Sequence, residues 1–181
     1  MARRYYRRRT VVVRPKKRWA TNIKGVNPAA FAVTNTAPSG FAINLVENSV
    51  ATATPTPTVL KTGNFKIQGD VTILNATSQA GELSLQIYIC YIPQGINVTS
   101  GTEIENLILQ HPEWIMAWKL CDIGSLAVGA QNGFTISSRL KRNLQSGDRV
   151  AIMGVARTDL TLATPQQVKV NAVCQYWTTT A

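Results

Sequence analysis

Apolar and polar residues alternate with a period of two along most of the chain, and this pattern predicts β-strands. Between Glu82 and Ile92, for example, every second residue from Leu83 onward is apolar or aromatic. The clearest segments of this kind are 65–73, 82–92, 134–140, 150–156 and 168–176, and the weaker ones are Ala30–Thr36, Phe41–Val50 and Trp114–Cys121. We therefore expect about eight strands.

One segment has the pattern of a helix instead. Thr102-Glu-Ile-Glu105 matches a capping box, and Ile104, Leu107 and Ile108 share one face of the helix that would follow. Pro112 should end this helix after about two turns. Long loops are expected at 49–60, 124–132 and 158–167. Eight strands, one short loop helix and no β-α-β alternation predict an all-β fold, an antiparallel sandwich of two sheets.

Charge is distributed very unevenly along the chain. Of the 19 Lys and Arg residues, ten lie in the first 24 positions, and this stretch contains no acid. The rest of the chain contains the other nine bases and all nine acids, so it is formally neutral. A run of like charge this dense repels itself and cannot be buried. We therefore expect residues 1–24 to form a disordered arm and residues 25–181 to form a single folded domain.

The arm has the chemistry of a nucleic-acid ligand. Arginine has a planar fork that fits phosphate oxygens, and aromatic rings stack on unpaired bases. Arg139, Lys141 and Arg142 form a second, smaller basic cluster near the end of a predicted strand, where the alternative to a phosphate contact is a solvated turn. The predicted nucleic-acid-binding residues are Arg3, Arg4, Tyr5, Tyr6, Arg7, Arg8, Arg9, Arg14, Lys16, Lys17, Arg18, Trp19, Lys24, Lys141 and Arg142. A nuclear-localisation signal is compatible with this role, and attraction to membranes or polysaccharides is the remaining alternative.

Several other classes of protein are not expected. The apolar run Val11–Val13 is too short for a secretory signal, and no window approaches the length of a membrane span, so we expect a soluble protein without membrane insertion. Cys90, Cys121 and Cys174 are far apart, and His111 is the single histidine. This set lacks the paired ligands of a zinc site and the partners of a catalytic triad. We therefore expect no enzyme activity, no catalytic residues, no metal and no cofactor.

The folded part is weakly charged, and much of its polar surface must come from threonine, of which the chain has 20. Desolvating a hydroxyl costs less than desolvating an ion, so such a surface is suited to burial against neighbouring subunits. Trp114, Trp118 and Trp177 are interpreted as anchors of the core or of an interface, in preference to the alternative that they are platforms for base stacking. These features predict a homo-oligomer.

A short arginine-rich arm joined to one eight-stranded domain resembles the capsid proteins of circovirus-like viruses with circular single-stranded DNA. Three stretches strengthen the resemblance, namely Lys61–Thr72, Ile89–Gly95 and His111–Lys119. The resemblance implies a jelly roll, sixty copies in a T=1 icosahedral shell, and inward-directed arms that package a single-stranded DNA genome without sequence specificity. It also implies a virion protein that passes through the host nucleus and cytoplasm and meets the host import machinery. The alternative is a non-viral nucleic-acid-binding module of the ribosomal or single-strand-binding type.

Overall fold

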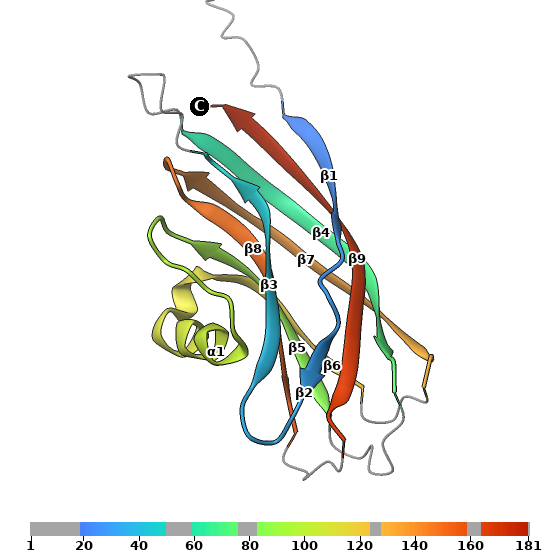
Figure 1. Ribbon diagram of the computed structural model, residues 1–181. Helices are drawn as coiled ribbons and strands as arrows, with labels where there is room; N and C mark the ends of the chain where they lie inside the picture. Colours follow the sequence, from blue (N-terminus) through green and yellow to red (C-terminus); the bar gives the residue numbers. More distant parts are fainter. Residues whose placement is uncertain (1–18, 50–58, 76–82, 124–127, 159–163, 181) are drawn as a thin grey trace, which may run out of the picture.

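The computed structural model describes residues 19–49, 59–75, 83–123, 128–158 and 164–180. Two antiparallel sheets pack face to face as a sandwich (Figure 1). The 5-stranded sheet consists of β1 (Ala20–Val26), β2 (Phe31–Val33), β4 (Leu60–Ile73), β7 (Gln131–Leu144) and β9 (Gln166–Thr180). The 4-stranded sheet consists of β3 (Ser39–Glu47), β5 (Ser84–Ile92), β6 (Ile115–Asp122) and β8 (Arg149–Arg157).

The order of the strands is that of a jelly roll. One sheet has the order β1-β9-β4-β7 and the other β3-β8-β5-β6. Both β1 and β2 pair with β9, so they occupy the place of a single first strand. Counted this way, eight strands cross between the sheets as in a double Greek key, with β5 and β6 as consecutive neighbours in one sheet. The predicted all-β sandwich is confirmed. The first strand is split near Pro28, which has no N–H to donate to the ladder.

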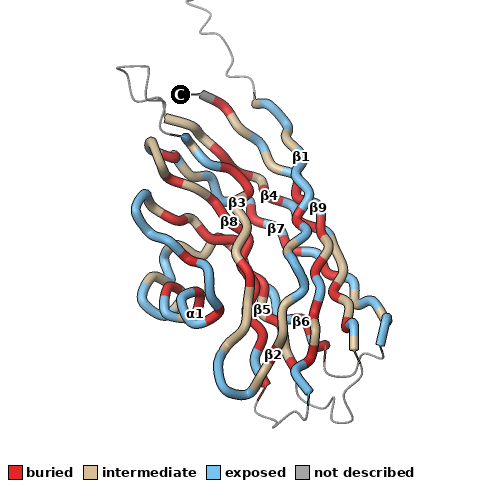
Figure 2. The backbone as a smooth tube through the Cα atoms, viewed as in Figure 1, coloured by how far each residue is buried: buried red, intermediate tan, exposed pale blue. Residues whose placement is uncertain are grey.

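The core fills the space between the two sheets, where the buried positions face each other (Figure 2). Phe65 and Ile67 of one sheet and Leu85, Ile87 and Ile152 of the other are fully buried. Removing each such side chain from water contributes about 1.5–3 kcal/mol. The period-two pattern thus marks the inward face of strands such as β4 and β7.

The strand β1 is the element that the sequence analysis missed. Residues 20–24 were assigned to the disordered arm, but they pair with β9 in a register that runs from Ala20 opposite Thr178 to Val26 opposite Ala172. Of this strand only Val26 is buried, so it lacks the apolar alternation that predicts a strand. The expectation of disorder is therefore wrong for residues 20–24, and residues 1–18 lie outside the described part of the chain.

The helix α1 (Gly101–Gln110) lies where it was expected, but its capping box was misplaced. The side chain of Ser100 accepts a hydrogen bond from the N–H of Glu103, and the Glu103 carboxylate accepts one from the N–H of Ser100. The box is therefore two residues earlier than predicted. Ile104 and Leu107 of α1 pack on the outer surface of the 4-stranded sheet, and the 3-10 helix η1 (Pro112–Trp114) follows. The loop expected at 49–60 lies largely outside the described residues, and those expected at 124–132 and 158–167 lie partly outside them. Both of the latter were predicted slightly too long, because residues 131–132 belong to β7 and residues 166–167 to β9.

Candidate nucleic-acid interface

Four of the predicted nucleic-acid-binding residues lie in the described part of the chain: Trp19, Lys24, Lys141 and Arg142. The rest, from Arg3 to Arg18, lie outside it. The structure brings Trp19 and Lys141 together and places the other two elsewhere. The site is therefore built around the point where the chain enters β1.

Trp19 and Lys141 meet on the outer face of the 5-stranded sheet. The Nζ atom of Lys141 lies 5.3 Å from the centroid of the Trp19 ring, within the range of a cation–π contact. Lys141 is on β7 and is opposite Gly63 of β4. Because β9 and β4 separate β1 from β7, the two side chains must reach toward each other over the middle of the sheet. The missing side chain at Gly63 leaves room for this contact.

Arg142 does not share this surface with Lys141. Neighbouring residues on a strand point to opposite faces of the sheet. The Arg142 guanidinium donates a hydrogen bond to the carbonyl oxygen of Glu113 at 2.8 Å and lies 5.5 Å from the centre of the Tyr91 ring. It therefore contacts η1 and β5, on the side of the 4-stranded sheet. Lys24 is exposed on β1 opposite Cys174, whose side chain is buried, so Lys24 points to the core side of the sheet at its edge.

Other cations lie on the same face as Lys141: Arg139, which was predicted as part of the second basic cluster, and Lys61 and Lys66, which were not predicted as binding residues. Lys66 is opposite Ser137 in the register of β4 and β7, and Arg139 follows two residues later on the same side. Together with Lys141, these residues form what we call the outer basic cluster: Lys61, Lys66, Arg139 and Lys141. Three members are exposed, and Lys61 is half-buried. The signal was present in the sequence, since all four occupy the polar positions of two alternating strands.

Trp177 adds an aromatic ring to this face. It lies on β9 opposite Gly63, so Gly63 separates it from Lys141. The side chain of Trp177 is 39% exposed and belongs to neither hydrophobic core cluster. The expectation that Trp177 is a core anchor is therefore wrong, whereas its role in an interface stays a prediction.

The folded domain is formally neutral, but its positive and negative charges are unevenly divided between the two sheets. In its described residues, the 5-stranded sheet has seven cations and one carboxylate, Asp70. The 4-stranded sheet, with α1, η1 and the turn before β8, has three cations and six carboxylates. The cations of this second group are Lys119, Arg149 and Arg157, and its carboxylates are Glu47, Glu103, Glu105, Glu113, Asp122 and Asp148. An anionic ligand is therefore attracted to the 5-stranded sheet.

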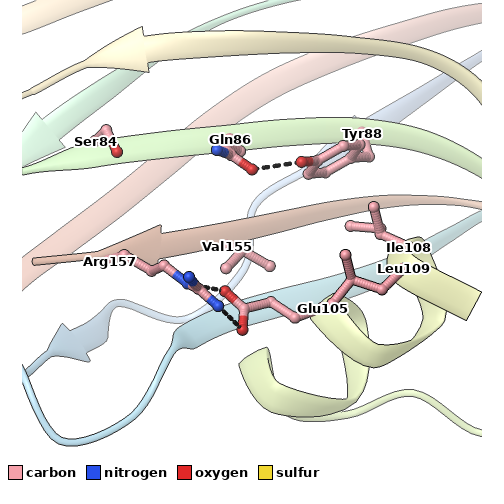
Figure 3. A pocket seen from close by; sticks show the side chains of 8 residues that line it. All are labelled: Ser84, Gln86, Tyr88, Glu105, Ile108, Leu109, Val155 and Arg157. Carbon is pink, nitrogen blue, oxygen red and sulfur yellow. Dashed lines mark hydrogen bonds and ion pairs between the residues drawn. The ribbon is translucent and has the colours of Figure 1, made fainter.

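A cavity of about 230 Å³ lies on the opposite sheet, between β5, β8 and α1 (Figure 3). Glu105 and Arg157 form an ion pair beside it, and the Tyr88 hydroxyl donates a hydrogen bond to Gln86. Among the described residues that line the cavity, the only carboxylate is the one held by Arg157, and none is a histidine or a cysteine.

The other candidate groups for chemistry are dispersed. His111 stacks on Trp114 with ring centroids 3.8 Å apart, and its Nδ1 atom lies 3.1 Å from the Glu113 carboxylate. Within the described residues, no group of three or more His, Cys, Asp or Glu side chains is placed to hold a metal ion. The same residues include no helix with the length and apolar character needed to cross a membrane.

No family model and no curated protein matches the chain. Among solved structures, the chain is similar to that of Desmodium yellow mottle tymovirus, with 13% identity, 92% of this chain and 91% of that chain covered, and a TM-score of 0.38. Turnip yellow mosaic virus is 14% identical over 88% of this chain and 93% of its own, with a TM-score of 0.38. Tobacco necrosis virus is 8% identical over 88% of this chain and 94% of its own, with a TM-score of 0.37. At these values the likenesses assign no function to this chain.

Proposed function

We propose that this chain is the subunit of a small viral capsid that packages single-stranded DNA through its N-terminal arm. The observation that carries the proposal is the position of the basic segment. Residues 1–18 contain nine Lys and Arg and no acid, and they join the jelly roll at Trp19, beside Lys141. The charges of the folded domain are separated between its two sheets. A polycation attached to the cationic side gives the subunit one surface suited to nucleic acid.

The remainder of the subunit is suited to contact with further copies. The weakly charged surface has a low desolvation cost, and Trp118, Leu120 and Leu109 are exposed on the side of the 4-stranded sheet and α1. Large exposed apolar side chains mark surfaces that become buried in assemblies. The proposed assembly is a T=1 shell with the arms inside. The arm also has the composition of a nuclear-import signal, and this second role is part of the proposal.

The test is expression of the full chain and of a variant in which the nine arm cations are replaced by glutamine. The replacement keeps the length of the arm and spares β1, which begins at Ala20. Negative-stain electron microscopy should show closed particles for the full chain, and the ratio of absorbance at 260 and 280 nm should show nucleic acid inside them. The variant should form particles that are largely empty.

Two outcomes would contradict the proposal. Particles of the glutamine variant that are as full as those of the wild-type chain would exclude the role of the arm. A wild-type chain that stays monomeric under all assembly conditions would instead favour the non-viral nucleic-acid-binding module. Light scattering after size-exclusion chromatography separates a monomer from a shell.

A further inference from the structure

We propose that the outer face of the 5-stranded sheet is a second binding surface for single-stranded nucleic acid, which continues the path of the arm across the folded domain. This inference rests on the proposed packaging function and names a surface for the same ligand. It also orients the subunit, because the 5-stranded sheet would then face the interior of the shell.

The first argument is the concentration of positive charge. Residues two apart on one strand are separated by about 6.7 Å, and neighbouring strands are about 4.8 Å apart. The four side chains of the outer basic cluster therefore start within about 17 Å of one another. Asp70 is the one carboxylate on this face in the described residues, and it lies further along β4, with its Oδ2 atom 3.5 Å from Nδ2 of Asn171.

The second argument is that no ion pair between described residues compensates this charge. The two ion pairs of the described residues, His111 with Glu113 and Glu105 with Arg157, lie elsewhere in the molecule. Like charges that share one face repel each other, and a polyanion relieves this repulsion while it releases its own counterions. The outer basic cluster therefore favours a ligand with closely spaced phosphates.

The third argument is the presence of aromatic rings beside the cations. Trp19 and Trp177 lie on the same face as the cluster, where the Trp19 ring contacts Lys141 and Trp177 lies on β9 opposite Gly63. A base that stacks on an aromatic side chain gains about 1–3 kcal/mol, and every base has a face that can stack. Rings between phosphate-binding cations thus favour a single strand, whose bases are accessible, and bind it without reading its sequence.

The opposite sheet provides an internal comparison. Trp118 is 62% exposed on β6, more than Trp177, but its neighbours on that face are Leu120 and Asp122. The cation nearest to this surface on β8 is Arg157, which is paired with Glu105. An exposed ring without cations lacks the phosphate contacts that would hold a strand beside it.

The first experiment maps where a single strand lies on the full-length protein. The protein is photo-cross-linked to an oligothymidylate of roughly 16 nucleotides, the upper size for one small β-domain, and the cross-linked peptides are identified by mass spectrometry. Cross-links are expected at Trp177 and in β4 or β7, in addition to the arm, and not at Trp118. Cross-links confined to the arm, or equally frequent at Trp118 and Trp177, would overturn the inference. The former result would leave the proposed packaging function intact.

The second experiment measures affinity with matched variants. Lys66→Gln removes an exposed cation from the outer basic cluster, whereas Lys119→Gln removes an exposed cation from β6 of the other sheet. One phosphate contact on a single strand contributes about 0.7 to the slope of log affinity against log salt. If Lys66→Gln and the wild-type protein bind equally at 1 M salt, Lys66→Gln should bind about fivefold more weakly than the wild-type protein at 0.1 M salt.

The control variant Lys119→Gln should bind like the wild-type protein. Neutralising all four residues of the outer basic cluster should reduce the salt slope by about 3, and thermal melts check that each variant is folded. Equal affinities for Lys66→Gln and Lys119→Gln would refute the surface. A wild-type protein that binds no oligothymidylate at all would refute the packaging function as well, so the two failures are distinguishable.

Discussion

Gly63 faces Lys141 so closely that a Cβ atom on Gly63 would lie 2.8 Å from Cγ of Lys141. The same atom would lie 3.1 Å from the carbonyl oxygen of Leu140, so the backbone of β7 is also in contact. The absence of a side chain at this one position allows Lys141 to lie across β4 and reach Trp19. Local packing and the geometry of the proposed binding surface therefore depend on the same glycine.

The substitution Gly63→Ala should displace Lys141 and destabilise the fold. Crowding a packed position by one methyl group costs about 1–3 kcal/mol, which urea denaturation would measure. The fluorescence of Trp19 should change as well, because the cation above its ring moves away. Gly133→Ala is the matched control on the same sheet, since its Cβ would meet its nearest neighbour at an ordinary 3.9 Å. Equal stability of the two variants would contradict the packing argument.

Glu103 should make the stability of the protein depend on pH in the acid range. Backbone hydrogen bonds from Thr99 and Ser100 hold the pKa of the Glu103 carboxyl at about 2, below its ordinary value of 4.5. The pKa is lower in the folded state, so the stabilising effect is fully present above about pH 4.5 and is lost as the pH falls toward 2. Glu103→Gln keeps a capping side chain but does not titrate.

The measurement for Glu103 is the melting temperature of both proteins between pH 2 and 7. The wild-type protein should lose more of its melting temperature below pH 4.5 than Glu103→Gln does. Ser100→Ala removes the other half of the capping box and should cost about 0.5–2 kcal/mol at neutral pH. Parallel melting curves for wild type and Glu103→Gln would exclude this carboxylate as a source of the pH dependence.

Asp148 connects two loops of the domain through its buried carboxylate. It accepts hydrogen bonds from the Tyr91 hydroxyl at 2.8 Å, the Gln94 N–H at 3.1 Å and the Gln145 N–H at 2.9 Å. Tyr91→Phe removes one donor and should cost about 1 kcal/mol, whereas Asp148→Asn replaces a charged acceptor and should cost about 1.5–3 kcal/mol. Denaturant midpoints of the two variants test this order. A larger loss of stability for Tyr91→Phe than for Asp148→Asn would contradict the prediction that the Asp148 carboxylate contributes more than the Tyr91 hydroxyl.

The three cysteines should react slowly with thiol reagents in the folded protein. Burial raises the pKa of Cys90 and of Cys174 to about 12, and it raises the pKa of Cys121 as well. Little thiolate is present at pH 8, and the thiolate is the reactive form. Labelling with Ellman's reagent should therefore be slow in buffer and fast in denaturant. Rapid labelling of Cys90 in the native state would show that β5 opens locally.

Much of the fold could be predicted because its signals are local. The alternation in β5 and β9 and the short amphipathic pattern of α1 depend on neighbouring residues, so these elements were located to within a few positions. The strand β1 was missed because its edge position leaves Ile23 exposed and requires only Val26 to be buried. Its pairing with β9, more than 140 residues away, decides its conformation. The capping box was misplaced because Ser100 and Thr102 both precede a glutamate by three residues.

The sequence by itself determined that a dense cationic segment precedes a neutral, all-β domain, because charge content and apolar period are properties of consecutive residues. Only the tertiary structure decided that the neutral domain has a cationic sheet and an acidic one. The pairing of β4 with β7 and β9 brings Lys61, Lys66, Arg139 and Lys141 onto one face, and a shift of one residue in register would turn each side chain to the core. Such pairings join residues that are distant in the chain, and no local pattern specifies them.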